Sequence, residues 1–295
     1  MTRVTNNMMI RDFKNNYNRS QGTLNKYMNQ LSTGKRMQNV SDDPLSATKS
    51  LSTKSTIKYN EQHTENVQDG IKWLETTDMA LDDTVSTLRQ ARDLAVQGAN
   101  DSLTRNDREK LATEVSQLRE HLVEVGNSTY DDRYIFNGTN TTEAPYQNDP
   151  GNYVNGDDPK GTIYREVGQG VKVDINVVGE DERFSFNDIF EHLKELEDEL
   201  KGDGEEISSL IGDMDEDIED ALMARSRVGA RQQRMQLLES RLEAQKINHS
   251  KNLSETEDVD MAETITNLKM EENVHRASLA IGARVIQPTL VDFLR

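Results

Sequence analysis

The residues most able to do chemistry are a run of carboxylates in the second half of the chain. Asp213, Asp215 and Asp217 have the spacing of the first ligands in an EF-hand calcium loop. Ile218 stands where that loop needs its turn glycine, and Ala224 stands where its bidentate glutamate belongs. We therefore interpret the run as the acidic start of a helix. A calcium- or metal-dependent enzyme is kept as an alternative from a different functional class.

Other catalytic or cofactor chemistry finds no support in the residue types. The chain has no cysteine, which excludes thiol catalysis, Cys-ligated zinc and disulfides. Its five histidines form no pair at i, i+4, so a histidine metal site is not expected. Gly168 and Gly170 lack the third glycine of a dinucleotide fingerprint, because Val173 holds that place. We predict no catalytic, cofactor-binding or metal-binding residue and no enzymatic activity.

The strongest pattern is instead a heptad spacing of apolar residues at both ends of the chain. Near the N-terminus it runs through Ile10, Phe13, Tyr17, Ser20, Leu24, Tyr27 and Leu31. Near the C-terminus it runs through Met261, Ile265, Leu268, Glu272, His275, Leu279, Gly282 and Ile286. Isolated helices of this length are marginal in water, so each stripe requires a partner helix. We expect the two ends to pair with each other and with neighbouring subunits.

Helix signals also organise the region between these ends. Gly34 suits a left-handed helix end, and Asp43 with Pro44 suits the start of the next helix. The pattern predicts further helices over 45–98, 105–126, 187–201 and 205–250. A capping box formed by Ser254 and Glu257 is expected to open the last helix.

Residues 138–184 differ in composition from the helical segments. They contain three of the five prolines and seven of the 17 glycines. The runs TIYREV and VKVDINVV within them alternate as strands do. The predicted fold is therefore mainly α, an elongated antiparallel helical rod with a terminal coiled coil and a small β-rich inserted domain. The predicted domains are an inner domain (1–44 with 251–295), a helical rod (45–137 with 185–250) and an outer β-rich domain (138–184).

The charge distribution limits the class of partner. The formal net charge is -18 and the pI is about 4.7, which argue against nucleic acid as a partner. Residues 1–60 nevertheless hold ten Lys and Arg against three Asp and Glu. This asymmetry is either solvated surface or head-to-tail complementarity between subunits. No apolar run is long enough to cross a bilayer, and the first residues show no cleavable secretory signal.

Two terminal motifs resemble those of a known family. The segment LSTGKRMQNVSDDPLSATKSL resembles the N-terminal signature of the flagellin family, which opens the long axial helix. The C-terminal segment resembles the matching end of that family, and it finishes in Gln287, Pro288, Leu290 and Leu294. The last helix is more charged than is usual in the family, with Lys269, Glu271, Glu272 and Arg276.

Within this family, RVTNNMM and YIFNGTNTTEAPY are similar to members that join the flagellar hook to the filament. The resemblance implies a structural adaptor, exported unfolded through the flagellar type III apparatus and located at the hook-filament junction. The implied partners are the other junction protein, flagellin, further copies of the chain in a ring, and an export chaperone at the C-terminal helix. A short filament flagellin and a non-flagellar coiled-coil scaffold are the alternatives.

The assembly interface is expected to lie on the terminal helices. The residues assigned to it are Ile10, Phe13, Tyr17, Leu24, Tyr27, Leu31, Met261, Ile265, Leu268, Leu279, Ile286, Leu290, Phe293 and Leu294.

Overall fold

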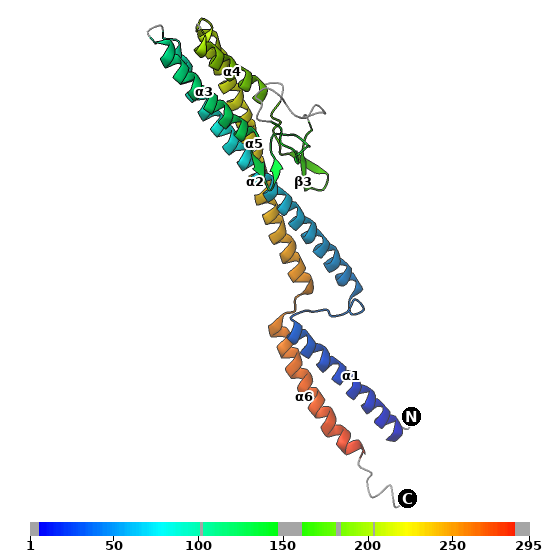
Figure 1. The fold of residues 1–295 in the computed structure, drawn as a ribbon. Helices are drawn as coiled ribbons and strands as arrows, with labels where there is room; N and C mark the ends of the chain where they lie inside the picture. The colour runs from blue at the N-terminus through cyan, green and yellow to red at the C-terminus, as the bar shows by residue number, and fades with distance from the viewer. Residues whose placement is uncertain (1–5, 101–102, 147–160, 181–183, 203, 287–295) are drawn as a thin grey trace, which may run out of the picture. The chain divides into compact units, whose positions relative to one another are not determined.

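The computed structural model describes residues 6–100, 103–146, 161–180, 184–202 and 204–286. Most of them are helical, and the elements follow one another as drawn in Figure 1. The helices are α1 (Asn6–Thr33), α2 (Pro44–Gly98), α3 (Arg105–Gly126), α4 (Phe186–Lys201), α5 (Ile207–Glu257) and α6 (Met261–Ile286). The strands are β1 (Thr129–Tyr130), β2 (Arg133–Tyr134), β3 (Tyr164–Gly168) and β4 (Val171–Asp174). The predicted mainly α fold with a small β-containing region is confirmed.

Local capping explains where several helices begin and end. Gly34 follows α1 with a φ of 69°, the left-handed conformation that glycine adopts without strain. The Asp43 carboxylate accepts a hydrogen bond from the Ser46 backbone N–H at 3.1 Å, so α2 starts at the predicted Asp-Pro pair. Thr104 caps α3 in the same way through the backbone N–H of Asp107.

The predicted capping box at Ser254 is wrong. Ser254 lies inside α5, which continues to Glu257, and its hydroxyl donates to the Asp258 carboxylate at 2.5 Å. The helix cap of α6 is Asp260, whose carboxylate accepts the backbone N–H groups of Ala262 and Glu263. The carboxylate of Glu257 is held by lysines, so it does not turn back to cap a helix.

The chain divides into two compact units, each described here by itself. Unit 1 comprises Met1–Lys58 and Lys246–Arg295, and unit 2 comprises Tyr59–Gln245. Unit 1 contains α1, α6 and the adjoining ends of α2 and α5.

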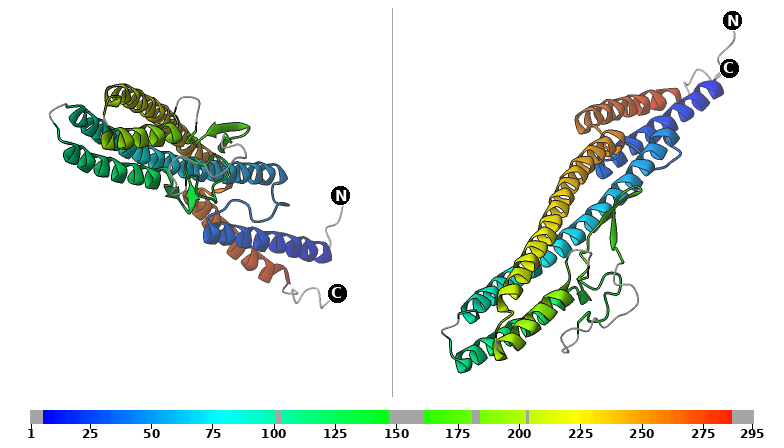
Figure 2. Two further views of the ribbon diagram at one scale, coloured as in Figure 1. Left: turned by 45° about the horizontal axis from the view of Figure 1, so that its top comes forward. Right: turned by 90° about the horizontal axis from the view of Figure 1, so that it is seen from above.

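Unit 2 is a bundle in which each helix runs antiparallel to the one before it. Residues of α2 pair with residues of α5 in descending order, from Gln68 with Glu239 to Arg92 with Asp215. In α3 and α4, Arg119 contacts Glu197 at 3.3 Å. Both views in Figure 2 show α3 and α4 beside the paired α2 and α5. The core between these helices is mostly aliphatic, with Trp73 of α2 also fully buried in it, and includes Leu74, Leu81, Leu88, Leu122, Leu193 and Val228.

The β-rich part of unit 2 packs against the helices through aromatic side chains. Two antiparallel hairpins form, β1 with β2 and β3 with β4. Phe136, Tyr146, Phe186 and Phe190 cluster where the irregular segments meet α4, with ring centroids 5.0–5.9 Å apart. Such aromatic pairs add to the stability gained from burial alone. Ion pairs from Arg165 to Asp69 and from Arg231 to Asp174 attach the β3–β4 hairpin to α2 and α5.

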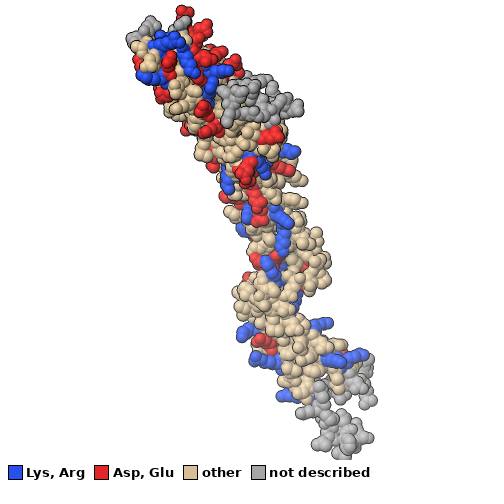
Figure 3. Space-filling view, viewed as in Figure 1, with Lys and Arg blue, Asp and Glu red and all other residues tan. Residues whose placement is uncertain are grey.

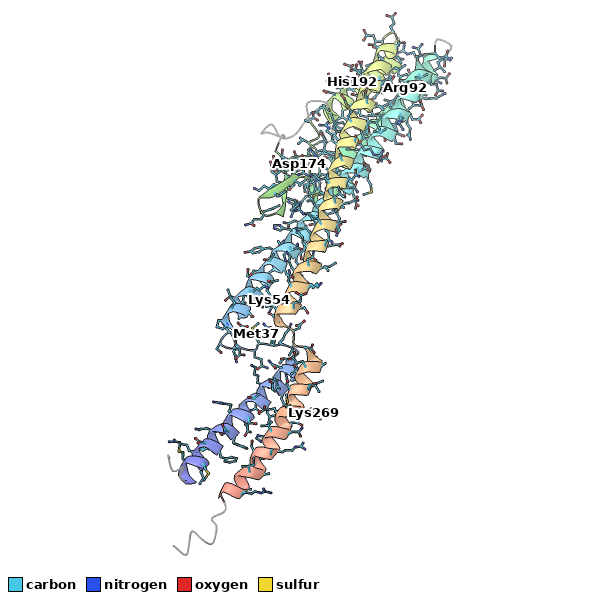
Figure 4. The ribbon with its side chains drawn as sticks, turned by 180° about the vertical axis from the view of Figure 1, so that it is seen from behind. Met37, Lys54, Arg92, Asp174, His192 and Lys269 are labelled. Carbon is cyan, nitrogen blue, oxygen red and sulfur yellow. The ribbon has the colours of Figure 1, made fainter. Side chains whose placement is uncertain are left out.

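A half-buried ion pair joins α4 to α5. The Nδ1 atom of His192 lies 2.8 Å from the Asp217 carboxylate (Figure 4 labels His192). The hydrogen bond to Asp217, opposed by burial, raises the pKa of His192 to about 8. Because the pKa of His192 is higher in the folded chain than in the unfolded one, the pair stabilises most just below pH 6.5, where Asp217 is still ionised. Burial raises the pKa of Asp217, so acid also weakens the pair. Its contribution is lost as the pH rises from 6.5 through about 8.

We expect His192→Gln to lose about 1–2 kcal/mol of unfolding free energy at pH 6 and almost nothing at pH 9. Thermal unfolding of both chains across that pH range measures the difference. The His121→Gln variant is the control, because His121 contacts Asp83 on the exposed surface. A gap between parent and His192→Gln that does not change with pH would contradict this account.

Candidate assembly interface

The two terminal helices pair along an antiparallel seam in unit 1. The ring of Phe13 in α1 covers Gly282 in α6, and a Cβ atom added at Gly282 would lie 2.1 Å from that ring. One turn further on, the rings of Tyr17 and His275 have centroids 5.0 Å apart. Large aromatic side chains of α1 therefore require small or flat partners on α6. Figures 1 and 2 show α1 and α6 side by side.

The middle of this seam is polar. Ser20 is buried and its hydroxyl donates to the Glu271 carboxylate at 2.7 Å. Thr264 on α6 is also buried, with its hydroxyl bonded to the Asp260 carbonyl at 2.7 Å. A seam that relies on such contacts buries less apolar surface than a leucine seam does, so it contributes less to stability.

The residues predicted for the assembly interface fall into three groups. Those half-buried between α1 and α6 or beside that seam are Phe13, Tyr17, Leu24, Tyr27, Leu31 and Leu268. Those exposed to solvent are Ile10, Met261, Ile265 and Leu279. Leu290, Phe293, Leu294 and the side chain of Ile286 lie outside the described residues.

The face that α6 turns toward α1 differs from the predicted stripe. It runs through Thr264, Leu268, Glu271, His275, Ser278 and Gly282, which also have heptad spacing. The predicted stripe shares only Leu268, His275 and Gly282 with it. The residues that distinguish the observed face are polar, with Glu271 bonded to Ser20 and Thr264 buried, and the larger apolar residues Met261, Ile265 and Leu279 are left exposed.

Exposed apolar residues remain on unit 1 outside this seam, on both flanks of α6, and we call them together the outer apolar face. Its α1 residues are Met8, Met9, Ile10 and Met28, and its α6 residues are Met261, Ile265, Met270, Val274, Leu279 and Ile281. Each is at least 36% exposed. Among them, Met261, Ile265 and Leu279 share one flank of α6 at helical spacing, and grouped exposure of this kind is typical of a protein–protein contact surface. On the side drawn in Figure 3, unit 1 carries scattered Lys and Arg and few Asp or Glu.

A cluster of charged and polar side chains in unit 1 joins the segment after α1 and the start of α2 to the end of α5. We call it the Glu257 clasp, made of Lys35, Ser50, Lys54, Glu257 and Asp258. Glu257 is 8% exposed, accepts a hydrogen bond from Ser50 and pairs with Lys54. Its second oxygen lies 3.3 Å from Lys35, which also contacts Asp258 at 2.7 Å. Lys54 is labelled in Figure 4.

Backbone hydrogen bonds reinforce the clasp. The Arg36 N–H donates to the Glu257 carbonyl at 2.6 Å, and the Val259 N–H donates to the Gly34 carbonyl at 3.0 Å. Burial acts against ionisation of Glu257, but hydrogen bonds from Lys54, Ser50 and Lys35 hold its pKa below the ordinary value. The segment after α1 is thereby attached to the junction of α5 and α6.

Two of the three aspartates that have calcium-loop spacing pair with side chains of other helices. Asp213, Asp215 and Asp217 lie within helix α5, where the chain cannot form a calcium loop. Asp215 pairs with Arg92 at 2.6 Å, and Asp217 pairs with His192. Over the residues that the structure describes, no three His, Asp or Glu side chains are grouped to hold a metal ion. The same residues include no helix that is both long and apolar enough to span a bilayer.

Two protein-family models match this chain, one over its N-terminal part and one over its C-terminal part. The model of the bacterial flagellin N-terminal helical region matches residues 4–141, and that of the C-terminal helical region matches residues 211–294. Together the two matches cover most of the chain.

Three individual proteins illustrate the range of relatives. Flagellar hook-associated protein 3 of Escherichia coli is 25% identical, with 94% of each chain covered. A flagellin of Halalkalibacterium halodurans is 27% identical, covering 89% of this chain and 88% of its own. A putative flagellar hook-associated protein from Vibrio parahaemolyticus has a similar fold, with a TM-score of 0.64 and 22% identity. That likeness covers 74% of this chain and all of the other.

Proposed function

Since this chain belongs to the flagellin family, we propose that it is a structural adaptor that joins the flagellar hook to the flagellin filament. The observation that carries this proposal is the match to hook-associated protein 3 over 94% of both chains. The family is one of structural flagellar proteins, and we assign the adaptor no enzymatic activity. Its place is the flagellum, at the hook-filament junction.

Assembly through the terminal helices is supported by the outer apolar face of unit 1. An isolated subunit leaves Met261, Ile265 and Leu279 in contact with water, and neighbouring subunits would cover them. In the proposed division of labour, residues 1–44 with 251–295 form the inner assembling domain. Residues 45–137 with 185–250 form the helical rod, and residues 138–184 form the outer β-rich domain.

The partners proposed for this adaptor are the other junction protein, flagellin and further copies of the chain in a ring. Many weak helix contacts repeated in a closed array can hold such a ring without any single strong interface. An export chaperone bound at the C-terminal helix fits the same exposed apolar residues of α6, because they need cover before assembly.

A short filament flagellin is the second candidate, supported by the 27% identity to the Halalkalibacterium flagellin. Immunolabelling of isolated flagella separates the two functions. An adaptor is expected to label a single band between hook and filament in each flagellum. Label distributed along the filament would instead identify a flagellin, and antibody against purified hook serves as the positional control.

A further inference from the structure

One outward face of α5 in unit 2 carries an exposed leucine between two arginines. Leu237 is 68% exposed, and it lies in a shallow surface hollow of about 400 Å³. The hollow is lined by Ala230, Gln233, Arg234, Leu237, Leu238 and Arg241. An exposed leucine alone is ordinary, but this one has a cation on each side and no acidic residue in the hollow. We call Arg234, Leu237 and Arg241 the arginine patch.

Other arginines of α5 are used within the subunit, which distinguishes them from the arginine patch. Arg225 pairs with Asp78 and Asp82 of α2, and Arg231 pairs with Asp174 of β4. Among the residues that the structure describes, neither Arg234 nor Arg241 forms an ion pair. The positive charge of the patch is therefore available to an acidic partner.

A face of opposite charge lies on α2 of the same unit. Met79 is 64% exposed, and the acidic residues beside it on the helix surface are Glu75, Asp82 and Asp83, of which Asp83 contacts His121. Asp82 pairs with Arg225 but keeps a side-chain exposure of 62%, so its carboxylate remains accessible. We call Glu75, Met79, Asp82 and Asp83 the acidic patch.

The two patches match in spacing. Arg234 and Arg241 are seven residues apart, as are Glu75 and Asp82, which corresponds to about 10.5 Å along each helix. If the helices run antiparallel with Leu237 over Met79, Arg241 lies opposite Glu75. The same alignment places Arg234 opposite Asp82, with Asp83 adjacent. One alignment thus satisfies the apolar contact and both charge pairs.

We propose that the arginine patch of one subunit docks on the acidic patch of a second copy of this chain. The proposal rests on the self-association put forward above and assigns surfaces to it. Because the two patches are different, each copy offers one and accepts the other. A heterologous contact of this kind continues from subunit to subunit and closes into a ring when the rotation permits.

Cysteine cross-linking tests the contact directly, because the chain contains no cysteine of its own. Flagella are isolated from cells expressing Leu237→Cys with Met79→Cys in one chain, mildly oxidised, and examined by non-reducing electrophoresis. We expect a ladder of covalent multimers that reductant removes, while each single variant stays monomeric. The matched control combines Leu237→Cys with Val96→Cys, since Val96 is a 50% exposed residue of the same helix α2.

Three results would overturn the contact. They are a double variant that stays monomeric, a ladder of equal strength from the Val96 control, and dimers from Leu237→Cys alone, which indicate a like-with-like contact. Immunolabelling of the same flagella reports whether the variant reaches the junction. Failure of the adaptor function, as misplaced label, is thereby distinguished from failure of this contact.

If the cysteine variants do not assemble, exchanging the charges of the two patches tests whether they face each other. Arg234→Glu with Arg241→Glu is expected to lower incorporation at least tenfold. Adding Glu75→Lys and Asp82→Lys to the same chain restores opposite charges between copies and should recover most of it, and Arg225 keeps its pair with Asp78. Without that recovery, the two patches do not face each other.

Discussion

Leu279→Asp is expected to abolish incorporation of this chain into flagella while leaving unit 2 folded. Leu279 is 46% exposed on α6, so an aspartate there is tolerated by the isolated subunit. In an assembly that covers the outer apolar face, the same carboxylate loses its water without gaining a partner. A penalty of about 4 kcal/mol per contact lowers association about 1,000-fold.

Immunoblots of isolated flagella and of the culture medium measure this effect. The variant should appear in the medium and be missing from flagella. Asn273→Asp is the matched control, because Asn273 is an exposed polar residue of the same helix and the change also adds one negative charge. Far-UV circular dichroism of the purified chains checks the fold. Normal incorporation of Leu279→Asp, or loss of helix equal to unfolding of unit 2, would contradict the assignment.

Glu257→Lys should open unit 1 at the clasp. The substitution replaces a nearly buried carboxylate, bonded to two lysines and a serine, with a third cation. Breaking a buried ion pair costs several kcal/mol, and we expect about 3 kcal/mol because Lys35 and Lys54 can turn to solvent. The segment around Arg36 then loses its attachment to the end of α5.

Limited trypsin digestion measures this detachment, because Lys35 and Arg36 become cleavage sites when the segment separates from the end of α5. When cleavage is slow compared with opening and closing, its rate follows the fraction of molecules in which the clasp is open. A loss of about 3 kcal/mol should therefore accelerate cleavage roughly 100-fold. Glu255→Lys is the control, as it makes the same charge change at an exposed position of the same helix. Equal cleavage rates for the two variants would show that the clasp does not hold unit 1.

The helices of unit 2 could be predicted from the sequence because their signals are local. The bounds of α3 were expected at 105 and 126, as observed, and Thr104 at its start is a favoured capping residue. The β3–β4 hairpin was likewise visible as two alternating runs. In these segments, side-chain periodicity and terminal residues lead to one structure only.

The seam of α6 could not be chosen in the same way. Two stripes with heptad spacing share its surface, and apolar content favours the one that contains Met261, Ile265 and Leu279. Gly282 and His275, which meet the rings of Phe13 and Tyr17, belong to both stripes. The structure uses the other stripe, in which Glu271 accepts a hydrogen bond from Ser20 and Thr264 is buried. Periodicity identifies a seam, but the polar partner that Ser20 of α1 presents, which apolar content does not reveal, distinguishes the two neighbouring stripes.

The Glu257 clasp was missed for a different reason. Its members lie at opposite ends of the chain, and the spacing of Ser254 and Glu257 imitates a helix start. Only the fold brings Lys35 and Lys54 to Glu257. The one sequence signal available was the excess of cations in residues 1–60, whose carboxylate partners could not be identified from position alone.

The pairing of α1 with α6 also determines the order in which the molecule can form. Ser20 and Glu271 are 251 residues apart, whereas Arg119 and Glu197 of the α3–α4 pair are separated by far fewer. Closing the longer loop costs roughly 1 kcal/mol more in chain entropy. Pairings between distant parts of a chain also form slowly. A polypeptide delivered one end first therefore completes its local bundle early, while its first helix waits unpaired until its last helix arrives.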